Sequence, residues 1–109
     1  MNTELEILPE NKLSLQKSTY FLIRVNGDSM INAGIHTGDY LLVDRSFGNT
    51  LDSIIIAEIN GKWTVKTYLE NKNGAFLMPQ NPKYKPIPIA EADNFKIIGK
   101  VVKVIKSFN

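Results

Sequence analysis

Cysteine is absent from this chain of 109 residues, and histidine occurs once, as His36. The lack of cysteine excludes disulfides, cysteine-rich zinc sites and thiol nucleophiles, and a single histidine makes a metal cluster improbable. Long apolar runs are also missing, because no stretch approaches the ~18 residues of a membrane span, and the polar N-terminus lacks a secretion signal. We therefore expect a soluble, cytoplasmic protein without a metal or cofactor and without a membrane partner.

The chain also lacks a large excess of either positive or negative charge. Thirteen Lys and Arg against eleven Asp and Glu give a net charge of +2, and the two signs are interspersed along the chain. Strong binding to nucleic acid through its phosphates usually needs concentrated positive charge, so we expect no direct DNA binding. The hydrophobic content of 43% and charged content of 22% are typical of a globular protein, and the length fits one domain.

The apolar segments are short, rich in Val, Ile, Tyr and Phe, and separated by Gly, Asn, Asp and Pro, which predicts a mostly β fold. Asn60-Gly61 predicts a tight type I′ hairpin, and Asn73-Gly74 a second turn. Four of the five prolines lie in residues 79–88, which we predict to be a loop or an edge segment. The predicted strands are residues 20–25, 39–44, 53–59, 62–70, 75–78 and 96–106, with a short extended piece around 86–89.

The sequence pattern gives fewer structural signals at the two ends of the chain. Residues 1–17 have no clear period and are interpreted as an N-terminal arm ahead of a domain formed by residues 18–109. The last predicted strand is apolar on both faces. It is either a central strand of the monomer or an edge that pairs with a second copy of the chain.

Chemistry-bearing residues concentrate in residues 24–30, at the end of the first long predicted strand. A serine that follows a Gly-Asp turn can present its hydroxyl and its backbone N–H to one pocket, because Gly27 permits close approach. Ser29 is therefore a candidate nucleophile. The alternative is that Asp28 or Ser29 only caps a short helical turn through residues 30–32, since both residue types are favoured N-caps.

A serine nucleophile needs a base, and His36 is the obvious first candidate, with Asp39 or Asp44 to orient it. However, His36 lies in a glycine-containing loop that holds nothing rigidly. The nucleophile-elbow pattern G-x-S-x-G is also absent at Ser29, because Ile31 stands where the second glycine would be.

Lys66 is the second candidate base. A lysine can act as a base when burial keeps its amine neutral. The Asn60-Gly61 hairpin would place Lys66 opposite Ile55, in apolar surroundings with few counter-charges. The alternative is that Lys66 is a solvated strand lysine like Lys62. The expected neighbours of Lys66 on the sheet are Ile55, Ala57, Thr64 and Tyr68.

The run YFLIRVNGDSMI at 20–31, with Gly34-Ile35 and GDYLLVD at 38–44, resembles the catalytic segment of the LexA/UmuD family of self-cleaving serine peptidases. Thr64-Val65-Lys66 is similar to the lysine motif of that family and has the family's spacing, since Lys66 follows Ser29 by 37 residues (66 − 29). Residues 77–87 and 98–102 are similar to the closing strands. The likeness extends over roughly residues 18–106.

The resemblance implies a twisted, mainly antiparallel β domain of the LexA/UmuD C-terminal type. In it Ser29 would be the nucleophile, Lys66 the general base, and the backbone N–H groups of Asp28 and Ser29 the oxyanion donors. It also implies a homodimer that forms partly through the C-terminal strand.

Only 28 residues precede Ser29, too few for the DNA-binding domain that LexA and phage repressors carry ahead of this fold. The branch we expect is therefore the processed form of UmuD, the accessory subunit of an error-prone translesion polymerase in the SOS response, with a UmuC-like subunit and a RecA filament as partners.

One departure from the family concerns the cleavage site. Family members cut an Ala-Gly or Cys-Gly bond in the N-terminal arm, and no such pair precedes Ser29 here. The pair Ala33-Gly34 lies just past the serine, in a loop of the fold itself. Three interpretations stay open: a form that acts as already processed, cleavage of a partner chain in trans, or a dyad without a natural substrate. The alternative from another functional class is an interaction module with a vestigial dyad.

Overall fold

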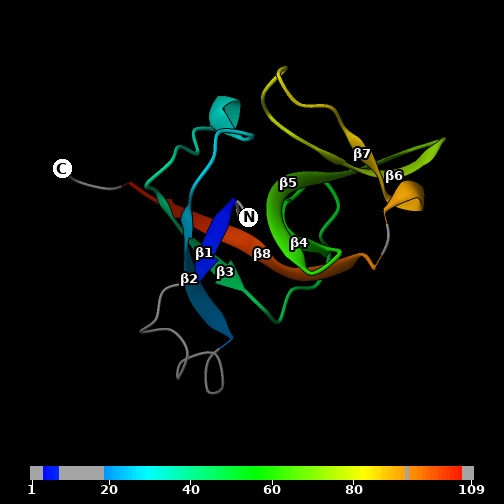
Figure 1. Cartoon of the computed structure of the whole chain (residues 1–109). Helices are drawn as coiled ribbons and strands as arrows, with labels where there is room; N and C mark the ends of the chain where they lie inside the picture. The colour runs from blue at the N-terminus through cyan, green and yellow to red at the C-terminus, as the bar shows by residue number, and fades with distance from the viewer. Residues whose placement is uncertain (1–3, 8–18, 93, 107–109) are drawn as a thin grey trace.

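A computed structural model describes residues 4–7, 19–92 and 94–106, and in this part of the chain the strands form one antiparallel sheet (Figure 1). The strand order is β1-β2-β3-β8-β4-β5-β6-β7. The mostly β, mainly antiparallel fold class is therefore confirmed. Within the described residues, no helix is long and apolar enough to cross a membrane. The strands are β1 (Leu5–Ile7), β2 (Tyr20–Val25), β3 (Tyr40–Asp44), β4 (Ile54–Ile59), β5 (Lys62–Asn71), β6 (Gly74–Met78), β7 (Ile87–Pro88) and β8 (Lys96–Ile105).

The predicted strands are confirmed to within one residue at each end. The hairpin between β4 and β5 turns at Asn60 and Gly61, whose φ angles are 53° and 81°, as a type I′ turn requires. Its register pairs Ile55 with Lys66, as expected. The second turn, at Asn73-Gly74, joins β5 to β6. The sequence analysis missed β1, because a strand of three residues is too short to show a period.

β8 is a central strand, which settles its place within the monomer (Figure 1). Residues 96–100 pair with β4 on one edge, and residues 100–105 pair with β3 on the other. Gly99 lies where β8 passes from one partner to the other, and an added Cβ there would lie 2.5 Å from Val43 Cγ1. β8 thus joins a group formed by β1, β2 and β3 to a group formed by β4, β5, β6 and β7.

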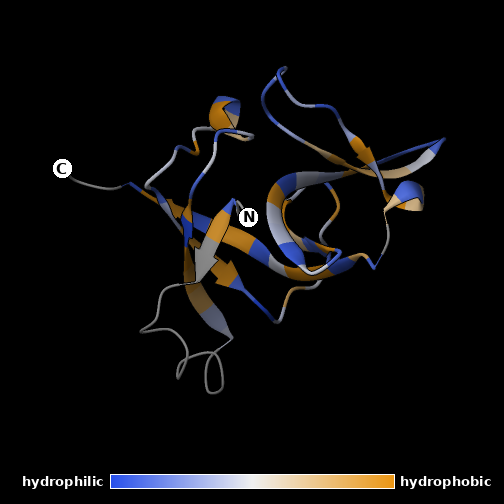
Figure 2. Cartoon of the chain, viewed as in Figure 1, coloured by the Kyte–Doolittle hydropathy of each residue, from blue (hydrophilic) through white to orange (hydrophobic). Residues whose placement is uncertain are grey.

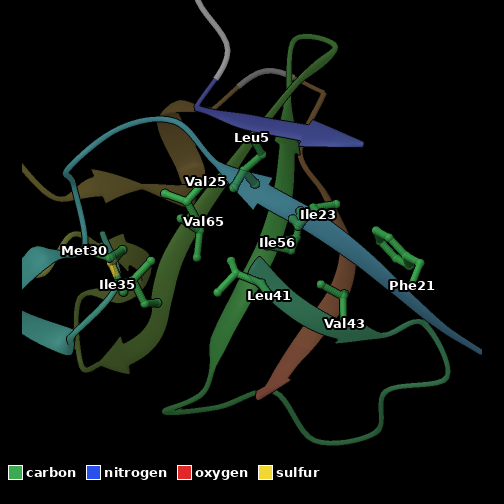
Figure 3. Packing of buried hydrophobic residues seen from close by; sticks show 10 residues of the cluster. All are labelled: Leu5, Phe21, Ile23, Val25, Met30, Ile35, Leu41, Val43, Ile56 and Val65. Atoms are coloured by element: carbon green, nitrogen blue, oxygen red, sulfur yellow. The ribbon is translucent and has the colours of Figure 1, made fainter. Parts of the chain in front are cut away.

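The core follows from the alternation of side chains along these strands. Figure 2 shows hydrophobic residues on the strands and hydrophilic ones in most of the connecting loops. β4 is buried on both faces, because Ile56 belongs to the larger cluster and Ile55 to a smaller one with Ala57 and Leu77. The larger cluster, shown in Figure 3, consists of Leu5, Phe21, Ile23, Val25, Met30, Ile35, Leu41, Val43, Ile56 and Val65.

Candidate active site

Ser29 lies on the turn that follows β2, and the turn is fixed from both sides. The backbone N–H of Gly27 donates to Thr37 Oγ1 at 3.0 Å, and the side chain of Met30 is buried in the core. The single-turn 3-10 helix η2 (Ile31–Ala33) begins after Met30, and no side chain caps it. The interpretation of Asp28 or Ser29 as a helix cap is therefore wrong, because Met30 occupies the N-cap position.

Lys66 reaches Ser29 from β5. Its Nζ lies 3.1 Å from Ser29 Oγ, and its side chain is only 8% exposed. The alternative of a solvated strand lysine is therefore wrong. The two side chains line a pocket of about 250 Å³ together with the turn at Asn26, Gly27 and Asp28, and with Glu4 and Tyr84. A buried amine thus contacts a serine hydroxyl at the wall of an open pocket.

Lys66 does have a counter-charge, and this corrects the expectation of few charges around it. The carboxylate of Glu4, just ahead of β1, lies 3.2 Å from Lys66 Nζ. It also accepts hydrogen bonds from the Ser29 hydroxyl, the Thr64 hydroxyl and the Val65 N–H, the last at 3.0 Å. Sequence spacing gives no signal for Glu4, because it meets β5 only through the fold.

The electrostatics of Lys66 reflect two opposed effects. Burial lowers the pKa of Lys66, the Glu4 carboxylate partly offsets this, and the pKa stays below the usual lysine value. Burial alone would raise the pKa of Glu4, but the charge of Lys66 and the hydrogen bonds from Ser29, Thr64 and Val65 bring that pKa below its usual value. The site therefore favours an ionised Glu4, while Lys66 is more easily neutralised than an exposed lysine.

A loop far along the chain holds the serine turn in place, a role that the sequence analysis missed. Asn81 Nδ2 donates to the Asp28 carbonyl at 2.8 Å, and the Gln80 N–H donates to the Ser29 carbonyl at 2.8 Å. The Asp28 carboxylate accepts hydrogen bonds from Tyr84 Oη and from Lys83 Nζ. The prolines predicted that residues 79–88 form a loop, but they gave no indication that this loop contacts the serine turn.

Removing the Asn81 side chain is expected to slow the reaction of Ser29 with a fluorophosphonate. The substitution Asn81→Ala deletes one hydrogen bond to the turn, a loss of about 1 kcal/mol, which corresponds to about a fivefold lower rate if it falls on positioning of the nucleophile. Labelling kinetics with intact-mass detection measure this rate. Lys83→Ala is the matched control, because its exposed ion pair to Asp28 contributes little. Equal rates for both variants would contradict a role of Asn81 in holding the turn.

His36 does not join this site. Its exposed ring contacts Lys106 Nζ at 3.1 Å and Asp39 Oδ2 at 3.9 Å, and among the described contacts none links it to Ser29. Asp39 accepts hydrogen bonds from the His36 N–H and from Lys106, while Asp44 binds Ser46. Both candidate orienting carboxylates are thus engaged elsewhere, and the geometry favours Lys66 over His36 as the base.

Comparison with known proteins agrees with this geometry. Residues 2–102 match the Peptidase S24-like family. The LexA repressor of Acetivibrio thermocellus is 41% identical over 92 residues, which are 84% of this chain and 42% of that protein. The LexA repressors of Acidothermus cellulolyticus and Mycolicibacterium smegmatis are 37% and 38% identical over 101 residues, or 93% of this chain and 36% and 40% of theirs.

The chain thus spans about two fifths of the length of these curated relatives. Because they are LexA repressors, LexA gives a nearer name for this chain than the UmuD branch that we expected. The match extends over both the serine turn and the lysine strand. This chain is a member of the Peptidase S24-like family, the self-cleaving serine peptidases of the LexA/UmuD type.

Proposed function

We propose that this chain is a LexA-like serine peptidase domain that works through a Ser29-Lys66 dyad. The observation that carries the proposal is the 3.1 Å contact between Lys66 Nζ and Ser29 Oγ, made by an amine that is almost fully buried. Such a contact lies within the hydrogen-bond reach that a general base needs. The substrate would be an extended peptide segment that enters the pocket beside the serine turn.

The reaction follows from these positions. Neutral Lys66 takes the proton of the Ser29 hydroxyl as Oγ attacks the peptide carbonyl, and the backbone N–H groups of Asp28 and Ser29 stabilise the oxyanion. The lysine then gives the proton to the leaving amine, and an acyl group stays on Ser29. Water, deprotonated by Lys66, attacks this ester, which restores the serine hydroxyl and releases a peptide that ends in a carboxylate.

The test is covalent labelling of the purified chain by a fluorophosphonate. We expect one adduct on Ser29, none in Ser29→Ala, and unchanged labelling in His36→Ala. A synthetic peptide with an Ala-Gly bond, added in trans, should be cut by the wild-type chain and left intact by Ser29→Ala. An inert Ser29 would instead support a non-catalytic interaction module of the same fold with a vestigial dyad.

Labelling of Ser29 is expected to accelerate with rising pH. Burial holds the pKa of Lys66 below its usual value, and only the neutral amine can accept the serine proton. Below that pKa, each pH unit downward should lower the rate about tenfold, and above it the rate should level off. Stability should also rise with pH between the folded and unfolded pKa values, because in this window the unfolded lysine binds a proton that the folded one lacks. A rate that is flat from about pH 6 to pH 10 would contradict Lys66 as the base.

We also propose a cellular role for this chain. It would be a cytoplasmic homodimer, formed partly through the C-terminal strand, that acts in the SOS response to DNA damage. The names of the LexA relatives support the pathway. The second candidate role is that of UmuD, as an accessory subunit of an error-prone translesion polymerase with a UmuC-like subunit and a RecA filament as partners. The dyad motifs around Ser29 and Lys66, which resemble those of the whole LexA/UmuD family, support this candidate. Sedimentation tests the dimer, and binding to a purified UmuC-like subunit separates the two roles.

A further inference from the structure

Four hydrogen-bond donors converge on one carboxylate at the dyad. The Ser29 hydroxyl, the Thr64 hydroxyl, the Val65 N–H and Lys66 Nζ all contact the side chain of Glu4. Three of these donors belong to consecutive residues of β5, and the fourth is the nucleophile itself. We call these four groups the carboxylate cradle. So many donors on one acceptor group describe a binding site for an anion of that shape.

The described residues next to Glu4 hold it in this position. Leu5 is buried in the core, β1 pairs with β2, and the Asn26 N–H donates to the Glu4 carbonyl at 2.6 Å. Gly27 leaves room for the Glu4 side chain, because a Cβ at that position would lie 3.2 Å from Glu4 Cγ. Backbone pairing, burial and close approach thus all direct the same carboxylate toward the dyad.

We propose that the carboxylate cradle is a binding site for peptide carboxylates, and that Glu4 is its intramolecular ligand, which slows the peptidase. The inference rests on the proposed peptidase function. Hydrolysis of an acyl group on Ser29 would leave a carboxylate beside Oγ, where the carboxylate of Glu4 now lies. Glu4 therefore takes the place of a bound product, and the external ligand of the cradle is a peptide with a free C-terminal carboxylate.

The direction of the hydrogen bonds explains why this contact inhibits. Lys66 donates to Ser29 Oγ, while the Ser29 hydroxyl donates to Glu4. Catalysis needs the opposite arrangement, with Lys66 as the acceptor of the serine proton. The ionised Glu4 stabilises the charged amine, so removing its charge leaves burial to favour the neutral amine without opposition.

Other charges near the cradle do not replace Glu4. The hydrogen bond from Tyr84 to Asp28 raises the pKa of the tyrosine, and the charge of Glu4 adds to this effect. The Asp28 carboxylate is engaged by Tyr84 and Lys83. Among the described residues, Glu4 is the carboxylate that contacts Lys66. A change of charge at Glu4 should therefore change the pKa of Lys66 directly.

The first experiment compares fluorophosphonate labelling of Ser29 at pH 7 in the wild-type chain and three variants. We expect Glu4→Gln and Glu4→Ala to react at least tenfold faster than the wild type. Glu6→Gln, which removes the same charge from the neighbouring strand β1, should react at the wild-type rate. The ¹³Cε resonance of Lys66 should titrate at lower pH in Glu4→Gln than in the wild type. This second readout is independent of labelling and also reports that the variant is folded.

The second experiment adds soluble carboxylates that can bind the carboxylate cradle in place of Glu4. In Glu4→Ala, propionate should slow labelling back toward the wild-type rate, and propionamide should not. A short peptide with a free C-terminal carboxylate should slow labelling at lower concentration than propionate, and the same peptide with an amidated C-terminus should have no effect. The wild type should be insensitive to all four compounds, because its cradle is already filled.

The outcomes separate this inference from the proposed function. If Ser29 is labelled in a Lys66-dependent way but Glu4→Gln and Glu4→Ala are no faster, the peptidase proposal stands and the inhibitory role of Glu4 is overturned. If propionate and propionamide act alike on Glu4→Ala, the carboxylate specificity of the cradle is overturned. If Ser29 is inert in every variant at every pH, the peptidase function fails and the inhibition falls with it.

Discussion

Replacing Lys66 by methionine is expected to lower the rate of Ser29 labelling by about 10²- to 10⁴-fold, the usual contribution of a positioned general base. The serine hydroxyl would keep its place on the turn but would lose the amine that accepts its proton. Lys66→Arg should be equally slow although it keeps the positive charge, because a guanidinium is not deprotonated in this pH range. Time courses of labelling followed by intact mass give both rates.

The same substitution also affects stability, and the sign depends on Glu4. Lys66→Met removes the counter-charge of a largely buried carboxylate, so the free energy of unfolding at neutral pH should fall by about 1–2 kcal/mol. The double variant Lys66→Met/Glu4→Gln removes both charges and should recover most of that loss. Urea denaturation of the two variants measures this difference. If labelling persists in Lys66→Met while the chain stays folded, another group is the base and the dyad is wrong.

Replacing Gly99 by alanine is expected to destabilise the chain by about 1–3 kcal/mol or more, the range found for overpacked cores. The added Cβ would lie 2.5 Å from Val43 Cγ1 and 2.9 Å from the Asp44 carbonyl oxygen. The carbonyl belongs to β3, which pairs with β8 at this point, so it cannot move without disturbing that pairing. Equilibrium denaturation measures the change, and the labelling rate of Ser29 should fall in parallel with the folded fraction.

Gly48→Ala is the matched control for this prediction. Gly48 lies in a loop, has no positive φ, and an added Cβ there would meet nothing within 4 Å. Its free energy of unfolding should change by no more than about 0.5 kcal/mol. Equal stability of the two variants would mean that β8 and β3 do not approach each other as closely at Gly99 as the structure shows.

Local sequence signals were enough to predict most of the fold. Alternation along residues 20–25 and the Asn60-Gly61 turn each act over a few residues, so the strand positions and the register opposite Lys66 could be read directly. The pairing of β8 with both β3 and β4 depends on contacts between distant segments, which left a central strand and a dimer edge as equal alternatives.

In the candidate site, too, contacts between distant segments could not be predicted from local sequence. Ser29 and Lys66 were found because the spacing of their motifs resembles that of a known family, and the structure brings the two side chains into contact. Glu4 could not be predicted, because nothing in the sequence distinguishes it from the other glutamates of an arm without a period. Asn81 was likewise hidden, since its hydrogen bond to Asp28 joins residues 53 positions apart.

The position of β8 has a consequence for when the chain could first react. Ser29 follows β2 and Lys66 lies on β5. Among the strands that the structure describes, their two groups pair with each other through β8, which comes last in the sequence. A nascent chain on the ribosome would already carry both reactive side chains but not the strand that joins the two halves of the sheet. We therefore expect the sheet that carries the dyad to be completed late in synthesis, when β8 is in place.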